Sequence, residues 1–256
     1  MPRSTTPPIS FTQDNFESVL NGSKTETRRV LTLKGLNQQE INSFKSIYQD
    51  GGGNWIAWSD DSPDHAEFTK KAYPNGEGFK SKYQVGDRCY LTEPTQILNI
   101  TPEDSIDIEE CEVSYFLGAK NTSYEGITDR RWIELVNDDD SLRICNRSTG
   151  IFSKQNQRFM LKSFARYHIL IESVKVERLF DITIEGAIAE GIATLKPYPD
   201  SDLAIYKDYH TGLFNSTCAR QSYLSEIAKI HEKKGGWDFV KGNPWMWVYK
   251  FRLVES

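Results

Sequence analysis

The sequence predicts an α+β fold built around a mixed or barrel-like sheet. Short segments with strand character alternate with a few short helical segments along the 256 residues, without the regular spacing of βαβ units. Two irregular stretches, at about residues 34–82 and 94–159, interrupt this alternation. We therefore expect a single domain over residues 1–256 that carries two insertions.

The first elements are expected to be a short strand and a short helix. Ile9–Phe11 has strand character, and Asp14–Leu20 has apolar residues at helical spacing with Asp14 suited to the N-cap. Gly22 is expected to end the helix in a left-handed conformation. The stretch Gly22–Arg29 that follows is rich in basic and hydroxyl side chains, which indicates a polar site.

The first insertion is predicted to contain at most a hairpin. Glycines and prolines are frequent between residues 34 and 82, and Trp55–Trp58 is its one apolar segment. Its aromatic residues are expected to pack the insertion onto the core, with stacking on a nucleic-acid base as the alternative; they are Trp55, Trp58, Phe68 and Tyr73.

A turn and a strand are predicted over Tyr83–Glu93. Cys89 and Leu91 alternate with polar neighbours, so one face of this strand should be buried. Glu93 stands where the strand meets a loop, as a solvated carboxylate or as a site residue. The second insertion is acidic and has weak strand signals at Cys111–Phe116 and Arg131–Val136.

His168–Leu179 is predicted to be a strand of the core sheet, because it is β-branched and alternates after Val174. Asp181 or Thr183 can cap a short helix that Gly191 closes. Glu190 then lies in the last turn, where the helix dipole raises the pKa of a carboxyl group. This position suits a proton donor, although a plain surface glutamate is the alternative.

The last third is predicted to hold a loop, a helix and a strand. Ala193–Asn215 has loop composition, and Ser222–Lys234 is an amphipathic helix whose inward residues are Tyr223, Ile227 and Ile230. In the closing strand Asn243–Val254, one face is formed by Trp245, Trp247, Tyr249, Phe251 and Leu253. We interpret this stripe as core, with a base-stacking platform as the alternative.

Composition and charge exclude several functional classes. A net charge of −5 argues against a protein that coats nucleic acid through positive charge, although residues 154–178 are locally basic. No apolar run approaches the ~18 residues of a membrane span, and Met1–Pro8 is no secretory signal, so we expect a cytoplasmic protein. The four cysteines and four histidines are not spaced as metal ligands, so reduced thiols and no metal or cofactor are expected.

Four segments, in order, resemble the ASCH domain family of the PUA-like superfamily, particularly its larger bacteriophage and prophage members. The family has a helix ending in Gly-x-Lys-Thr-x-Thr-Arg-Arg, a Gly-Asp strand ending in glutamate, a strand-then-helix motif and a closing Asn-Pro-Trp-x-Trp-Val. The similar segments here are Gly22–Arg29, Tyr83–Glu93, Val176–Leu179 with Ala187–Ile192, and Asn243–Val248. Together with their surroundings they cover about half of the chain.

This resemblance implies a small mixed β-barrel with flanking short helices and a cleft along Lys24–Arg29. Some small ASCH proteins are amidohydrolases that deacetylate N4-acetylcytidine with a lysine, a threonine and a glutamate, which fall here on Lys24, Thr27 and Glu190. The residues expected to bind the substrate are Arg28, Arg29, Glu93, Lys162 and Arg166. If the chain is phage-encoded, the expected compartment is the host cytoplasm.

In this mechanism Lys24 takes a proton from Thr27 or from a water, and Glu190 passes a proton to the leaving amine. Arg28 or a backbone N–H holds the developing oxyanion. Since residues 24 and 27 of a regular strand point to opposite faces, the mechanism requires an irregular segment there.

Two other functions remain open from the sequence. A non-catalytic PUA-like module would bind RNA or single-stranded nucleic acid, with basic residues on the phosphates and an aromatic side chain on a base. A ribonuclease using the same basic residues is the third possibility. A modified nucleoside or nucleotide is the expected partner of the enzyme, no membrane is expected to be one, and the sequence gives no oligomeric state.

Overall fold

The computed structural model describes residues 7–51, 53–58, 78–101, 110–115, 129–134, 156–196 and 204–254. The chain divides into two compact units. The first unit comprises Met1–Gly22, Gly86–Leu170 and Arg252–Ser256, and the second comprises Ser23–Val85 and Ile171–Phe251.

The first unit pairs strands from distant parts of the chain. β1 (Pro8–Ser10) runs parallel to β5 (Arg88–Thr92), which pairs antiparallel with the first residues of β9 (His168–Arg178). Both faces of β5 are buried, because Tyr90 and Thr92 are covered as well as Cys89 and Leu91. The prediction of a single buried face was therefore too narrow.

Helix α1 (Gln13–Leu20) forms where the sequence predicts it, with a different cap. Thr12 is the N-cap, because its side chain accepts the N–H of Asn15, while Asp14 lies inside the first turn. Gly22 has a φ of +78°, as expected of a glycine that ends a helix in the left-handed conformation.

The second insertion contributes an antiparallel three-stranded sheet to the first unit. β6 (Thr95–Thr101) pairs with β7 (Glu110–Tyr115), and β7 pairs with β8 (Asp129–Glu134). The strands predicted near β7 and β8 are thus confirmed, apart from Phe116, Leu135 and Val136, which lie outside the described residues. The short helices η1 (Gln157–Phe159) and η2 (Lys162–Phe164) flank the core of this part, which includes Met160, Leu161 and Phe164.

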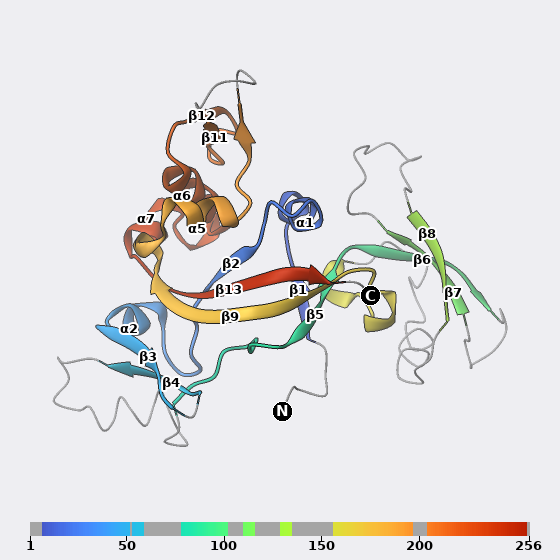
Figure 1. Cartoon of the computed structure of the whole chain (residues 1–256), viewed down its shortest axis with the longest axis horizontal. Helices are drawn as coiled ribbons and strands as arrows, with labels where there is room; N and C mark the ends of the chain where they lie inside the picture. The colour runs from blue at the N-terminus through green and yellow to red at the C-terminus, as the bar shows by residue number, and fades with distance from the viewer. Residues whose placement is uncertain are drawn as a thin grey trace. The chain divides into compact units, whose positions relative to one another are not determined.

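The second unit is organised on three adjacent strands, visible side by side in Figure 1: β9, β13 (Trp245–Val254) and β2 (Glu26–Val30). β13 and β2 are antiparallel, with Met246 opposite Val30 and Val248 opposite Arg28. The end of β9 leads through η3 (Leu179–Asp181) into α5.

Helices α5 (Ile184–Ala189), α6 (Ala219–Ile230) and α7 (Trp237–Lys241) gather together in Figure 1. They share one hydrophobic core with Met246 and Val30, so they cover the face of β13 and β2 that carries these two residues. Tyr223 and Ile227 are buried as predicted, but Ile230 is 51% exposed because α6 ends there. That prediction was wrong.

The opposite face of β13 is covered by residues of the first insertion. Trp247 makes edge-on ring contacts with Trp55 and Phe79, and Tyr249 does so with Tyr83. Aromatic packing of the insertion onto the core is thus confirmed at Trp55, while Trp58 is 45% exposed. Phe68 and Tyr73 lie outside the described residues.

The predicted hairpin is present as β3 (Ser46–Gln49) and β4 (Trp55–Trp58), preceded by an unpredicted helix α2 (Gln38–Asn42). Three further strands occupy the segment interpreted as a loop: β10 (Thr194–Leu195), β11 (Ile205–Lys207) and β12 (Phe214–Ser216). A 3₁₀ turn η4 (Glu232–Lys234) follows α6.

In β13 the even-numbered Met246 and Val248 are as buried as the aromatic stripe, whereas Leu253 is 40% exposed.

The structure is an α+β fold with a mostly β core of mixed sheets, as the sequence predicts. Within the described ranges every sheet is open, because each strand order has two ends and none returns to its first strand. No helix among those described is long and apolar enough to cross a membrane. Cys89 and Cys111 are buried and reduced, Cys218 is half-buried and reduced, and Cys145 lies outside the described residues.

Candidate functional site

The stretch Gly22–Arg29 lies against the end of helix α5 in the second unit. Thr183 caps the start of α5, Glu190 caps its end, and Gly191 adopts a φ of +78° that turns the chain. Lys24 and Glu190 then form an isolated antiparallel bridge, and the Thr25 N–H donates to the Ala189 carbonyl at 2.8 Å. Two motifs that are 166 residues apart in sequence therefore meet here.

Lys24 and Glu190 form a buried ion pair at this junction. Lys24 Nζ donates to Glu190 Oε2 at 2.5 Å and to the Glu190 carbonyl oxygen at 2.5 Å. Each residue is only 3% exposed. Removing two charges from water costs several kcal/mol per ion, so the pair depends on close contact and on further hydrogen bonds. It is the most tightly held titratable pair of this stretch.

Arg28 supplies the second cation of the site. Its Nη1 donates to Glu190 Oε1 at 3.2 Å, and its Nε donates to Glu177 Oε1 at 2.7 Å. Burial alone would lower the pKa of Arg28, but Glu190, Tyr223 and Glu177 together raise it, so Arg28 stays charged. Each oxygen of the Glu190 carboxylate thus faces a different cation.

Glu177 is held in its charged form by the same contacts. Burial alone would raise the pKa of this carboxyl, but the hydrogen bond from Lys175 and the charge and hydrogen bond of Arg28 lower it. Glu26 adds a third carboxylate to Arg28, with its Oε2 at 3.2 Å from Nη2. The guanidinium is therefore fixed in orientation from several sides.

Gly186 gives Arg28 the room that it needs. A Cβ at this position would lie 2.7 Å from Arg28 Nη2, and the Gly186 carbonyl accepts from Nη1 at 3.3 Å. A glycine in a helix costs about 1 kcal/mol relative to alanine. Close approach of the guanidinium to the backbone explains why a glycine is used here.

Tyr223 of α6 completes the cluster and was predicted only as a core residue. It is 1% exposed, and the Arg28 guanidinium lies 6.0 Å from the centre of its ring. Burial raises the pKa of this phenol, and the nearby Glu190 carboxylate adds to the increase. Its hydroxyl lies near the Glu190 carboxylate, and their interaction contributes to the raised pKa, although the geometry is too poor for a regular hydrogen bond. The phenol is therefore a neutral donor beside Glu190.

Thr27 does not share the face of these residues. Side chains alternate along β2, and cross-strand partners point the same way. Arg28 pairs with Val248 on the helix-covered face, whereas Thr27 pairs with Tyr249, whose hydroxyl bonds Ser81 at 2.7 Å on the opposite face. Lys24 and Arg28 both reach Glu190, so Lys24 belongs to the Arg28 face. Only Thr25 between them lies outside a strand, and Lys24 is an isolated bridge residue, so this one irregular position does not bring Thr27 onto the Lys24 face.

Glu93 and Arg166 pair with each other in the first unit. Arg166 Nε donates to Glu93 Oε1 at 2.8 Å, and its Nη2 donates to Glu93 Oε2. The guanidinium carbon also lies 4.1 Å from the Tyr115 ring centre and 5.1 Å from that of Tyr167. Glu93 is fully buried, so it is not the solvated carboxylate that the sequence allowed. The contacts of this pair are those of a structural ion pair.

Arg29 and Lys162 are the more accessible members of the predicted substrate-binding set. Arg29 is half-buried and pairs across the strand with Trp247, on the face of Thr27. Lys162 is exposed in the first unit. Burial and the positive charges of Arg88 and Lys162 lower the pKa of His168, so each of these two cations lies near His168. A basic group of Arg88, Lys162 and His168 therefore exists in the first unit.

Sequence reasoning missed Tyr223, Glu177 and Gly186 as members of the site. Two signals were available. The first is that a tyrosine on the inward face of a helix, such as Tyr223, usually has a partner for its hydroxyl. The second is that Glu177 is a charged residue in a predicted core strand, next to the basic Arg178. Gly186 gave no signal, because its role depends on an arginine far away in sequence.

Among the described residues, no group of three or more His, Cys, Asp or Glu side chains is arranged to hold a metal ion. Comparisons with known proteins found no matching family model, no similar curated protein and no similar solved structure.

A double-mutant cycle tests the energetic coupling of Lys24 and Glu190. Lys24→Met and Glu190→Gln should each lower the free energy of unfolding by about 2–4 kcal/mol, because each leaves a buried charge with fewer partners. The double variant should lose at least ~1.5 kcal/mol less than the sum of the two. Urea unfolding measures all three values.

The matched control is the exposed pair Lys229–Glu232, whose charged atoms are 3.4 Å apart. The same substitutions there should show a coupling below ~0.5 kcal/mol. Equal coupling in the two pairs would contradict a buried contact at Lys24.

Proposed function

We propose that this chain is an amidohydrolase that acts on a nucleoside, removing the acyl group from an N4-acylated cytosine such as N4-acetylcytidine. We also propose that it belongs to the ASCH family, with the PUA-like barrel as its ancestral architecture. The observation that carries the proposal is the Lys24–Glu190 contact, since it joins the two segments in which the motif resemblance located a catalytic lysine and glutamate. An ion pair with a purely structural role would not be expected at these two motif positions in particular.

The geometry favours water over Thr27 as the nucleophile. Lys24 already donates to Glu190, so in this state the carboxylate is the group that can accept a proton. Glu190 takes a proton from water as the oxygen attacks the acyl carbon, and the C–N bond of the amide breaks in the following step. The Lys24 ammonium gives a proton to the leaving N4 amine and recovers one from Glu190. The products are the free carboxylic acid and cytidine.

Arg28 and Tyr223 have supporting roles in this mechanism. Arg28 holds the second oxygen of Glu190 and fixes the direction of the first. The Tyr223 hydroxyl, which lies beside the Glu190 carboxylate without a regular hydrogen bond to it, is a donor for the oxyanion that develops on the acyl oxygen. A buried donor is effective because water does not compete with it.

Deacylation assays with three variants test the proposal. Wild-type protein should release cytidine from N4-acetylcytidine, and Lys24→Met and Glu190→Gln should each lower kcat at least ~100-fold because proton transfer is lost. Thr27→Val should keep kcat within ~3-fold, since Thr27 lies on the other face of β2. Chromatographic separation of cytidine from substrate gives the rates.

Lys233→Ala, at an exposed position, serves as the unaffected control. No cytidine release by the wild-type protein would refute the enzymatic function. A loss in Thr27→Val as large as that in Lys24→Met would return Thr27 to the role of nucleophile.

The role of Tyr223 separates activity from stability. Tyr223→Phe should lower kcat by ~10–100-fold at unchanged KM, because one oxyanion donor is removed. It should leave the free energy of unfolding unchanged or raise it by up to ~1 kcal/mol, because a buried hydroxyl without a regular hydrogen bond is removed. Steady-state kinetics and urea unfolding measure the two effects.

Tyr249→Phe is the matched control, since that buried phenol bonds Ser81 Oγ at 2.7 Å on the other face. It should cost about 1 kcal/mol of stability and leave kcat unchanged. A Tyr223→Phe variant with full activity would remove Tyr223 from the mechanism.

A second candidate function is binding of RNA or single-stranded nucleic acid. The specific observation in its favour is the basic group of Arg88, Lys162 and His168, because Arg88 and Lys162 are exposed. Three further basic residues, Lys24, Arg28 and Arg166, are paired with carboxylates. Binding would therefore use a small number of phosphate contacts and depend strongly on salt.

Salt titrations test this second function. Affinity for a single-stranded RNA of about ten nucleotides should fall with salt, and Lys162→Ala should reduce the slope of log K against log salt by about 0.7, the loss of one phosphate contact. Fluorescence anisotropy measures the slope. If Lys162→Ala and the control Lys233→Ala give the wild-type slope, the basic group does not bind the phosphates.

A further inference from the structure

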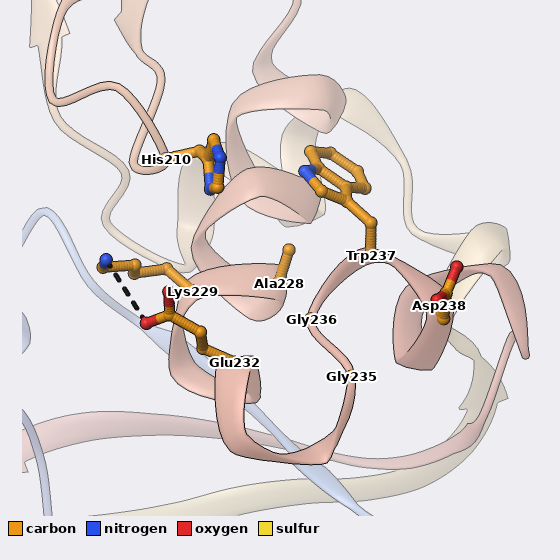
Figure 2. Close-up of a pocket in the computed structure, with 8 residues that line it drawn as sticks. All are labelled: His210, Ala228, Lys229, Glu232, Gly235, Gly236, Trp237 and Asp238. Atoms are coloured by element: carbon orange, nitrogen blue, oxygen red, sulfur yellow. Dashed lines mark ion pairs between the residues drawn. The ribbon is translucent and has the colours of Figure 1, made fainter.

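Helices α6 and α7 of the second unit border a pocket that the proposed hydrolase site does not use. The pocket has a volume of about 330 Å³, and Figure 2 shows His210 and Trp237 on two sides of it with Ala228 between them. The two consecutive glycines Gly235 and Gly236, both with positive φ, join α6 to α7 and add no side chains to its wall. Its apolar part is thus one indole, one methyl group and glycine backbone.

Trp237 is the most unusual member of this pocket. It is 38% exposed, and no hydrogen bond of its indole N–H and no ring contact of its indole exists among the described residues. An exposed tryptophan face at a pocket offers a stacking surface to a planar ring. The His210 imidazole likewise makes no hydrogen bond within the described ranges, so it is available to a ligand.

A second pocket of about 230 Å³ shares Trp237 as a wall. Its remaining lining is almost entirely uncharged and polar, and includes Asn215, Ser216, Thr217 and Gln221. Hydroxyl and amide groups of this kind donate to and accept from the hydroxyl groups of a sugar. Both pockets are lined by Trp237 and by residues of α6, Ser222 and Ser225 in one and Ala228 and Lys229 in the other, so an apolar part and a hydroxyl-binding part are neighbours there. The first pocket is in the ordinary size range of small-molecule sites.

The charges around these pockets disfavour a phosphate. The Lys229 ammonium is paired with Glu232 at 3.4 Å, and Asp238 is paired with Lys241 at 3.0 Å. Asp208 accepts the His210 backbone N–H at 2.8 Å. Although burial would raise the pKa of Asp208, this hydrogen bond and those from Thr211 lower it, so the carboxylate is charged. Three acids against two lysines leave an excess of negative charge, which disfavours an anionic ligand.

We propose that the double pocket around Trp237 binds an uncharged nucleoside, with the base stacked on the indole and the ribose hydroxyls at Asn215, Ser216, Thr217 and Gln221. A nucleoside matches the site because it joins a planar aromatic ring to a hydroxylated ring and carries no phosphate. A saccharide is polar around its whole rim and leaves the apolar part unmatched. The site does not include the residues of the Lys24–Glu190 cluster. The proposal therefore stands whether or not that cluster is catalytic.

Isothermal titration calorimetry with cytidine, adenosine and their 5′-monophosphates tests the proposal. These ligands carry no acyl group, so their binding does not depend on hydrolysis. Adenosine, which is not a product of the proposed reaction, should bind at one saturable site that Trp237→Ala weakens at least ~10-fold and Trp237→Phe weakens at most ~3-fold, since phenylalanine also stacks. The monophosphate should bind at least ~5-fold more weakly than its nucleoside, because of the acidic surroundings.

Trp58→Ala removes a comparably exposed tryptophan outside the pocket and should leave the affinity unchanged. Gln221→Ala should weaken the nucleoside but not the free base, which separates the two halves of the site if Trp237→Ala does not fold. The proposal is overturned if no nucleoside binds, if Trp237→Ala binds as wild type, if the monophosphate binds more tightly, or if methyl glycosides bind in place of nucleosides. If the pocket is separate from the hydrolase site, Trp237→Ala should lose nucleoside binding and keep its deacylation rate. A variant that loses deacylation but binds nucleosides normally would overturn the proposal.

Discussion

The contact between Lys24 and Glu190 connects a strand to the end of a helix, and much of the second unit is arranged to make it possible. The ion pair is buried, so its stability depends on further hydrogen bonds to the carboxylate. Arg28 takes the second carboxylate oxygen, and Glu177 with Glu26 holds Arg28 in turn. Gly186 is small because the guanidinium occupies the space of a side chain. These residues come from β2, β9 and α5, and each constrains the next.

This arrangement gives the proposed hydrolase site its electrostatic character. The Glu190 carboxylate lies between two cations and has a fixed direction, which suits a base that must meet a water at one angle. The Tyr223 phenol adds a neutral donor at the same place without adding charge. The basic group of the first unit has the opposite character, since its exposed cations suit long-range attraction of phosphates.

The sequence predicted elements whose signals are local. Helix α1, strand β9 and helix α5 were found because caps, glycines and apolar periodicity lie within a few residues of one another. Helix α2 and strands β10 to β12 were missed, because each is too short for periodicity to be visible. Ile230 was assigned to the core because it continues the spacing of Ile227, although the helix ends before its side chain meets another element.

The site was predicted in part for the same reason. Lys24, Arg28 and Glu190 lie in motifs that can be recognised one at a time, and their meeting required only that α5 turn back at Gly191. The orientation of Thr27 could not be predicted, because it depends on whether β2 is regular at residues 25 and 26. Tyr223 and Gly186 become site residues only through Arg28, and no local pattern reveals a contact over such a distance.

Strand β2 thus carries two interleaved sets of side chains with different surroundings. The even-numbered residues Glu26 and Arg28 face α5 and α6, and the odd-numbered Thr27 and Arg29 face the aromatic residues under the first insertion. The two sets share one backbone and face opposite sides of the sheet, so deletion of Thr25 would shift the register and exchange their environments. In related chains the four-residue interval from Lys24 to Arg28 should therefore be kept even where Thr27 has changed.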